Sequence, residues 1–132
     1  MIEDLILNAL VVIAVGLAGY SEAVMDTLSF HYKRSKLKDD NSKFWNPSIS
    51  WKNKYGVDGV TPKFPGSTTL FVFTTDAWHL FKFGRNLMLF IALPLIGHFN
   101  ESILGIVILA VICRVVFGIS FTFFYRYYSN KK

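Results

Sequence analysis

Residues 102–125 read SILGIVILAVICRVVFGISFTFFY, and Arg114 is the only charged side chain among them. An α-helix rises about 1.5 Å per residue, so a stretch of this length crosses the roughly 30 Å hydrocarbon core of a bilayer. A soluble domain of this size has no interior large enough to bury such a segment on every side. The stretch therefore predicts a transmembrane helix.

The composition of the whole chain agrees with a membrane location. Of 132 residues, 52% are hydrophobic and 17% are aromatic, which is more apolar surface than one small domain can bury. The net charge of +5 comes from basic residues that flank apolar segments, where cytoplasmic bias and anionic lipid explain them better than nucleic acid does. We therefore expect membrane lipids as partners and no nucleic acid. A lone cysteine, Cys113, provides neither a disulfide framework nor a cysteine-based zinc site.

Two further apolar segments precede this stretch. The first predicts a helix over about 4–33, and Glu3 and Asp4 stand where a signal peptide would carry positive charge, which favours a retained helix. The second predicts a helix over about 67–99, with Ser67 or Thr68 as its N-cap. With a third helix over about 102–125, residues 1–132 form a single all-α membrane domain, a polytopic bundle of three transmembrane helices. A four-crossing alternative separates 68–83 from 87–99.

The distribution of lysine and arginine predicts the orientation. The loop at about 34–66 and the tail at 126–132 are rich in these residues, which places both in the cytoplasm by the positive-inside rule. The N-terminus and the turn at 100–101 then lie outside, most readily in a bacterial inner membrane. The loop also carries Trp45, Asn46, Trp51 and Lys52, which suit an ordered cap on the inner surface. The alternative is a solvated basic linker.

Ionisable residues within the predicted membrane helices form the candidate site. Glu22 and Asp26 are four apart on the first helix and share a face, and Asp76 and His79 are three apart on the second. Counting residues from the outer ends places Asp26 level with His79 and Glu22 level with Lys82. His31 closes the first helix, and the depth of Arg114 is similar to that of Arg85. These positions predict one polar cluster in the inner half of the membrane.

Three interpretations of this cluster stay open. In the first, Glu22 and Asp26 form structural ion pairs with Lys82, Arg85 or Arg114, because an unpaired charge in hydrocarbon is costly. In the second, a divalent metal (zinc, manganese or iron) binds carboxylate and imidazole ligands drawn from Glu22, Asp26, Asp76, His79 and His31. In the third, acidic and histidine side chains conduct protons or ions, either within one chain or along a pore that the protomers of a homo-oligomer share.

Three polar segments, SEAVMDTLSFHY, FWNPSISWKNKYG and TTDAWHLFK, resemble those of a family of small bacterial integral membrane proteins. The resemblance covers about residues 20–85, and it implies that the polar residues of these segments belong to one site. It carries no activity to this chain.

We favour, as a hypothesis from the sequence, a membrane protein that binds a metal ion and acts on a lipid or lipid-like substrate. Metal-activated water would attack an ester or phosphate of that substrate. The alternative is a non-enzymatic membrane component, either a phage or envelope structural protein or a small oligomeric channel. In that case its charges form structural salt bridges.

Overall fold

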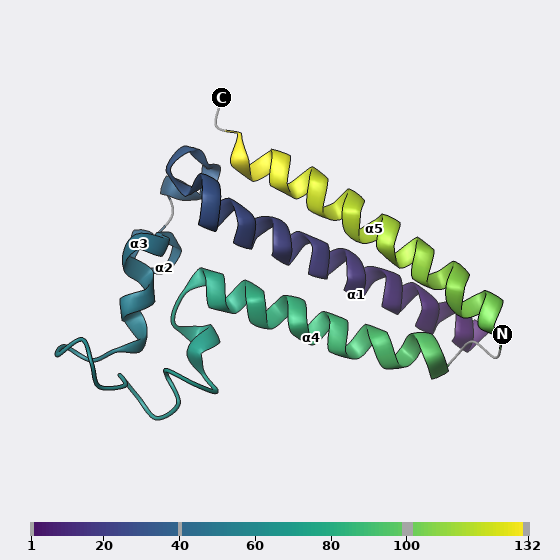
Figure 1. Ribbon diagram of the computed structural model, residues 1–132, viewed down its shortest axis with the longest axis horizontal. Coiled ribbons are helices and arrows are strands. Elements are labelled where there is room, and N and C mark those ends of the chain that lie inside the picture. The colour runs from purple at the N-terminus through teal and green to yellow at the C-terminus, as the bar shows by residue number, and fades with distance from the viewer. Residues whose placement is uncertain (1, 40, 99–101, 131–132) are drawn as a thin grey trace.

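A computed structural model describes residues 2–39, 41–98 and 102–130, and the predicted all-α class is confirmed for them, because they contain no β-strand. The long helices of the described ranges are α1 (Ile2–Asp26), α4 (Ala77–His98) and α5 (Ile103–Ser129). They form a layer in which α1 lies between α4 and α5 (Figure 1). Each outer helix packs extensively on α1, whereas α4 and α5 contact each other little. The central helix therefore sets the position of both neighbours.

The contacts along α1 show the direction of each neighbour. The Ser120 hydroxyl of α5 donates a hydrogen bond to the Gly16 carbonyl of α1 over 2.7 Å. Further along both helices, Tyr20 packs edge-on against Phe124. Helices α1 and α5 are therefore parallel, and their first residues lie at the same end of the molecule (Figure 1). Helix α4 is antiparallel to both.

Two helical stretches within the described residues are long and apolar enough to cross a membrane, namely Ile2–Arg34 and Ile103–Ser129. This result supports the predicted membrane location at the level of length and composition. Three or four crossings do not follow from it, because the first half of α4 carries His79, Lys82 and Arg85. Hydropathy alone therefore does not show whether α4 crosses the membrane, and its packing on α1 has to be considered.

The first helix continues beyond Asp26 with altered winding. A π-helical segment covers Thr27–His31, and a 3₁₀ turn follows at Tyr32–Arg34. The Thr27 hydroxyl donates to the carbonyl of Ala23, and the Ser29 hydroxyl donates to the carbonyl of Met25. Hydroxyl bonds of this kind compete with the regular backbone pattern, which fits the change of winding here. The helical path still ends close to the predicted residue 33.

The second long helix begins later than expected. Helix α4 starts at Ala77 rather than near 67, and its N-cap is Asp76, whose Oδ1 accepts a hydrogen bond from the His79 N–H over 3.0 Å. Residues before it form turns and the short 3₁₀ helix Val72–Thr74. The buried Ser67 hydroxyl donates to the Lys54 carbonyl, so it fixes the loop instead of capping a helix.

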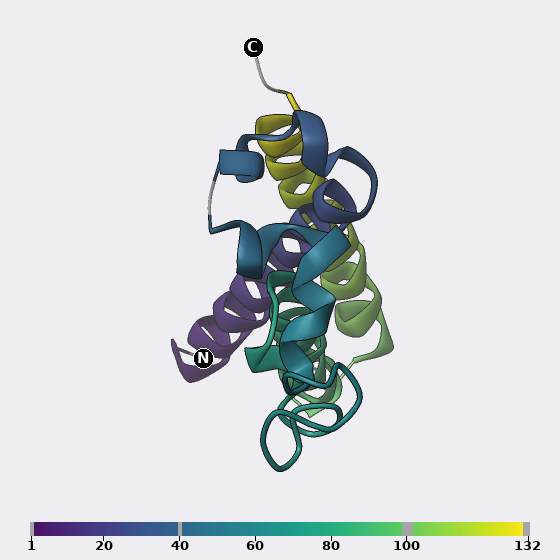
Figure 2. The same ribbon diagram turned by 90° about the vertical axis from the view of Figure 1, so that its left-hand side faces the viewer.

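The connection between α1 and α4 is ordered and faces the viewer in Figure 2. It contains the 3₁₀ segment Lys36–Asp39, helices α2 (Ser42–Trp45) and α3 (Pro47–Ser50), and the 3₁₀ segment Trp51–Lys54. A hydrophobic cluster joins it to the ends of the long helices. The buried members of that cluster are Val24, Leu28, Tyr32, Leu37 and Ala77, with Phe44 and Trp45 packed against them. The connection is therefore a folded part of the protein.

The exposed turn of this connection predicts a local pH response. Asp58 accepts hydrogen bonds from the N–H groups of Val60 and Thr61 and from the Thr61 hydroxyl. These bonds, led by the one from the Thr61 side chain, lower the pKa of the Asp58 carboxyl from its ordinary value. Because the folded pKa is lowered, the turn is stabilised above the ordinary pKa, and this stabilisation disappears as the pH falls through the folded pKa.

NMR spectra of the Val60 and Thr61 amides test this expectation. As the pH is lowered below about 4, we expect both amide chemical shifts to move toward the values of an unfolded chain. In Asp58→Asn, the same chemical shifts should not change over this pH range. Equal acid shifts in the wild type and in Asp58→Asn would contradict it.

Candidate functional site

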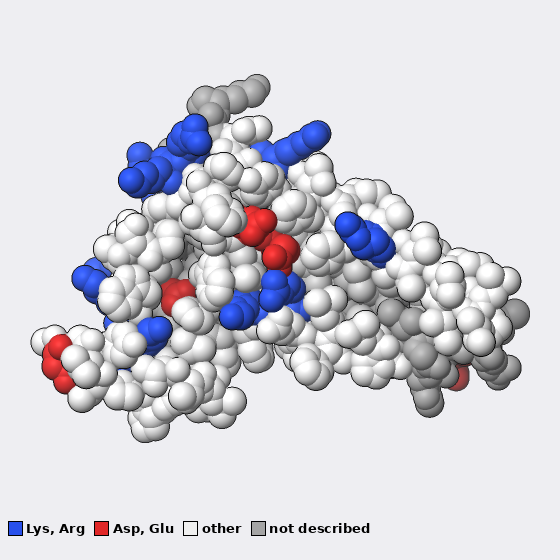
Figure 3. Space-filling model, in the orientation of Figure 1, with Lys and Arg blue, Asp and Glu red and all other residues white. Residues whose placement is uncertain are grey.

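An ion pair joins α1 to α4 in the middle of the bundle. Arg85 Nη1 donates to Glu22 Oε2, and about a quarter of each side chain is exposed, 25% for Arg85 and 26% for Glu22. The remaining guanidinium edge donates to Asn86 Oδ1 from Nε and Nη2, each over 3.2 Å. Acidic and basic side chains lie side by side near the middle of the face shown in Figure 3. This contact is one of the pairs that the structural interpretation considered.

Asp26 and Lys82 do not pair with each other or with another charge in the described part of the chain. Asp26 is partly buried one turn beyond Glu22, and Lys82 Nζ lies 4.9 Å from the centroid of the Trp78 ring. The Glu22–Arg85 contact places Glu22 three residues further along α4 than the expected level of Lys82. Three residues correspond to about 4.5 Å of helix, which is the error of counting depth from the helix ends.

Asp76 and His79 form a local unit at the start of α4. Asp76 is 2% exposed, and its Oδ2 lies 2.6 Å from His79 Nδ1. The Thr75 hydroxyl oxygen lies 3.3 Å from the same oxygen. Both carboxylate oxygens are therefore used within residues 75–79, and the spacing of three reflects a helix cap.

Removing this cap is expected to destabilise the fold. Asp76→Ala leaves the His79 N–H without its acceptor and should lower the free energy of unfolding by about 2 kcal/mol. Asp76→Asn keeps an oxygen acceptor for that N–H, so it should cost less than half as much. Unfolding of the detergent-solubilised protein by sodium dodecyl sulfate measures both variants. Equal losses in the two variants would show that the carboxylate charge, and not the cap, stabilises this helix end.

His31 is held by the third long helix. Its Nε2 lies 2.5 Å from the Tyr125 hydroxyl, and the two rings meet edge-on at 5.5 Å. The Tyr125 ring stacks on Phe121, one turn earlier on α5. His31 therefore fastens the end of the first helix to α5.

The five predicted metal ligands are not brought together. Glu22 contacts Arg85, Asp76 contacts His79, and His31 contacts Tyr125, so each contact is made in a different place. Within residues 2–39, 41–98 and 102–130, no three His, Cys, Asp or Glu side chains gather closely enough to hold a metal ion. The predicted single cluster is thus divided into separate polar contacts.

The predicted cap residues of the loop have different positions. Trp45 packs against α4, and the centroid of its ring lies 5.9 Å from the centroid of the Phe81 ring. Asn46 caps α3, because its Oδ1 accepts from the Ser48 N–H over 3.0 Å. Trp51 is 45% exposed, and Lys52 Nζ lies 5.7 Å from the centroid of its ring. Of these residues, Trp45 is the one that packs on the long helices.

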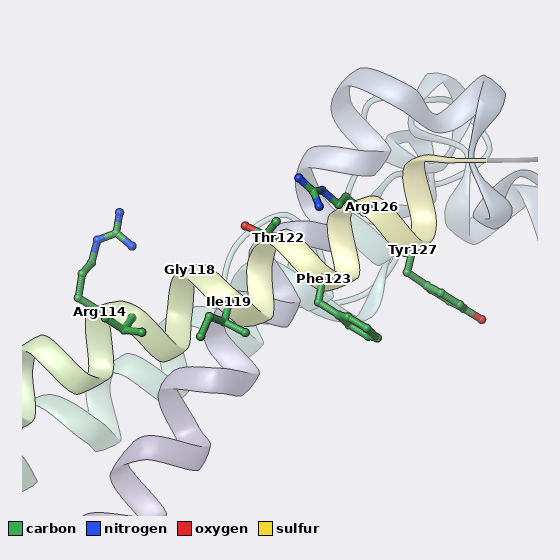
Figure 4. Close-up of a pocket in the computed structure, with 8 residues that line it drawn as sticks. Arg114, Gly118, Ile119, Thr122, Phe123, Arg126 and Tyr127 are labelled. Atoms are coloured by element: carbon green, nitrogen blue, oxygen red, sulfur yellow. The ribbon is translucent and has the colours of Figure 1, made fainter.

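Arg114 lies on the outer side of α5, where it lines a shallow groove of ≈ 840 Å³ with other residues of that helix (Figure 4). It makes none of the ion pairs found among the described residues. Reasoning from the sequence missed the other polar residues of this groove, Thr122 and Arg126. The spacing of four between Arg114, Gly118, Thr122 and Arg126 is the signal that would have found them.

Comparisons with known proteins give no relative from which to transfer a function. No protein-family model matches the chain, and neither a curated protein nor a solved structure matches it. The resemblance of three segments to small bacterial membrane proteins therefore stays a prediction, and the function is argued from the residues themselves.

Proposed function

We propose that this chain is a non-enzymatic integral membrane protein with three crossings, whose intramembrane charges hold the helices together. The observation that carries the proposal is the Glu22–Arg85 ion pair between α1 and α4. A carboxylate and a guanidinium within a bilayer are costly alone, and a direct contact between them satisfies both. The ion pair therefore stabilises the packing of α4 on α1, although the first half of α4 is polar.

The direction of the helices supports α4 as the third crossing. Helices α1 and α5 are parallel, so if both cross the bilayer, the chain between them has to return through it. Helix α4 is antiparallel to both and, at 22 residues, is about 33 Å long. That length matches the hydrocarbon core. Its core-facing Ala92 packs with Val11 and Val15 of α1.

The sidedness follows from the charge distribution. On the face shown in Figure 3, most lysine and arginine side chains lie over the end that contains the connection from α1 to α4 and the end of α5. By the positive-inside rule, we place this end in the cytoplasm and the N-terminus outside, in a bacterial cell membrane.

A structural role suits the way the polar side chains are used. Glu22, Asp76 and His31 each contact a partner that fixes one helix against another or caps a helix end. A phage or envelope structural component needs such fastening and no reacting group. We therefore favour this class over an enzyme.

Metal binding is the second candidate, and the Asp76–His79 contact favours it. A histidine that binds a metal commonly donates its other ring N–H to a carboxylate, as His79 Nδ1 can do toward Asp76. Zinc, manganese or iron at Nε2 would then activate water against a lipid or lipid-like substrate.

Elemental analysis of the detergent-purified protein distinguishes these candidates. We expect no stoichiometric metal in the wild type, in Asp26→Ala or in His79→Ala. Near-stoichiometric metal in the wild type that disappears in both variants would overturn the structural proposal and establish a metal site across two helices.

A further inference from the structure

Arg114 is a cation near the midpoint of the apolar helix α5, Ile103–Ser129. Its side chain is exposed on the outer surface of α5, and no carboxylate of the described ranges pairs with it. A guanidinium in hydrocarbon is costly unless it reaches an anion or the membrane surface. If α5 crosses the membrane, Arg114 therefore needs an anion beside it or a path to the membrane surface.

The groove around Arg114 has a polar row and an apolar row. Arg114, Gly118, Thr122 and Arg126 follow one another at a spacing of four, and Figure 4 shows the three side chains of this row on the same side of α5. The adjacent row contains Val115, Ile119, Phe123 and Tyr127. Gly118 makes room for the Arg114 guanidinium, since a Cβ there would lie only 3.1 Å from Arg114 Nη1. A ligand with an anionic head and an apolar tail matches both rows.

The two arginines of the polar row lean toward each other along α5 (Figure 4). Twelve residues separate them, which is about 18 Å between their Cα atoms. Arg114 reaches forward to Gly118, about 6 Å along the axis, and Figure 4 shows Arg126 leaning back toward Thr122. Both arginine side chains therefore approach the stretch of α5 between them, where Figure 4 shows Thr122. Guanidinium groups form strong paired hydrogen bonds to phosphate oxygens.

We propose that this groove binds the phosphate of an anionic phospholipid of the cytoplasmic leaflet, such as phosphatidylglycerol. The phosphate lies between Arg114 and Arg126, and one acyl chain follows the apolar row. The bilayer thins locally so that the phosphate meets Arg114, as happens around arginine in other membrane helices. This inference rests on the proposed insertion of α5.

A second copy of the chain fits the groove less well. Gly16 lies beside Ser120, so Asp26, ten residues later on the parallel helix α1, is level with the last residues of α5. In a copy of the same orientation, its carboxylate would thus lie about 20 Å further along the membrane normal than the Cα of Arg114. The depth of Asp26 is fixed by its helix, whereas a lipid phosphate can approach Arg114 where the bilayer thins.

Native mass spectrometry of the full chain, released from detergent after adding a defined lipid, tests the proposal. We expect phosphatidylglycerol to bind at least tenfold more tightly than phosphatidylcholine, and Arg114→Gln to remove this preference. Arg34→Gln removes an arginine from the exposed segment after α1 and should change binding less than twofold. Inorganic phosphate at the same concentration should not displace the lipid.

Gly118→Leu supplies an independent test, because it fills the polar row without changing any charge. It should also lose the preference for phosphatidylglycerol, even if Arg114→Gln fails to fold. Equal binding of both lipids, an unchanged preference in Gly118→Leu, displacement by inorganic phosphate, or a lipid-free dimer would each overturn the proposal. The topology of the chain is measured separately by cysteine labelling, so a negative lipid result with the expected labelling would leave the proposed function intact.

Discussion

Arg85→Ala is expected to lower the free energy of unfolding by about 2–3 kcal/mol, because it leaves the partly buried Glu22 carboxylate without its cation. Part of this loss comes from weaker packing of α4 on α1. Among the described residues, Arg85 and Glu22 form the ion pair that joins these two helices. Unfolding in detergent by sodium dodecyl sulfate, followed by circular dichroism, measures the change.

Two further variants show whether the contact itself is responsible. The double variant Glu22→Gln/Arg85→Gln removes both charges and should recover most of the loss, to within about 1 kcal/mol of the wild type. Lys82→Ala removes a charge one turn away that rests on the Trp78 ring, and it should cost about 1 kcal/mol or less. A loss in Lys82→Ala as large as in Arg85→Ala would mean that total charge, and not this pair, stabilises the bundle.

Gly19→Ala is expected to push α5 away from α1 and to lower the free energy of unfolding by about 2–3 kcal/mol. A Cβ at Gly19 would lie 2.6 Å from the Phe117 carbonyl oxygen and 3.2 Å from the Ser120 Cβ. The first of these atoms belongs to the backbone of α5, so a rotamer change cannot relieve the contact, and the helices themselves have to move.

Gly16→Ala, three residues earlier on the same helix, is the matched control. Its Cβ would meet Val116 Cγ1 at 3.5 Å, which is an ordinary contact. Alanine also loses less backbone entropy than glycine in a helix, so this variant should gain about 0.5–1 kcal/mol. The same unfolding titration compares the two. Changes of equal sign in both variants would contradict the close packing of α1 and α5 at Gly19.

The long helices that are apolar throughout could be predicted well from the sequence, because length and hydropathy alone indicate them. Helix α5 was expected over 102–125 and covers Ile103–Ser129. Helix α4 was expected about ten residues too early. The hydroxyls of Thr74 and Thr75 donate to nearby carbonyls and keep the chain in turns until Asp76 provides a cap.

The candidate site could be predicted in part. Its residues do lie on neighbouring helices, and one expected pair, Glu22 with Arg85, is present in the structure. The sequence could not exclude a single cluster. Counting residues does not show which side chains form hydrogen bonds within their own helix. Asp76 shows this, since its carboxylate serves the N–H and the ring of His79 three residues later.

Cysteine labelling of intact cells tests most directly whether α4 crosses the membrane. The variants Asp58→Cys, Ser102→Cys and Asn130→Cys are made one at a time in a Cys113→Ser background and treated with a membrane-impermeant maleimide. We predict that Ser102→Cys is labelled in intact cells, whereas Asp58→Cys and Asn130→Cys are labelled only after the membrane is permeabilised. Labelling of Asp58→Cys and Ser102→Cys from the same side would contradict a third crossing by α4.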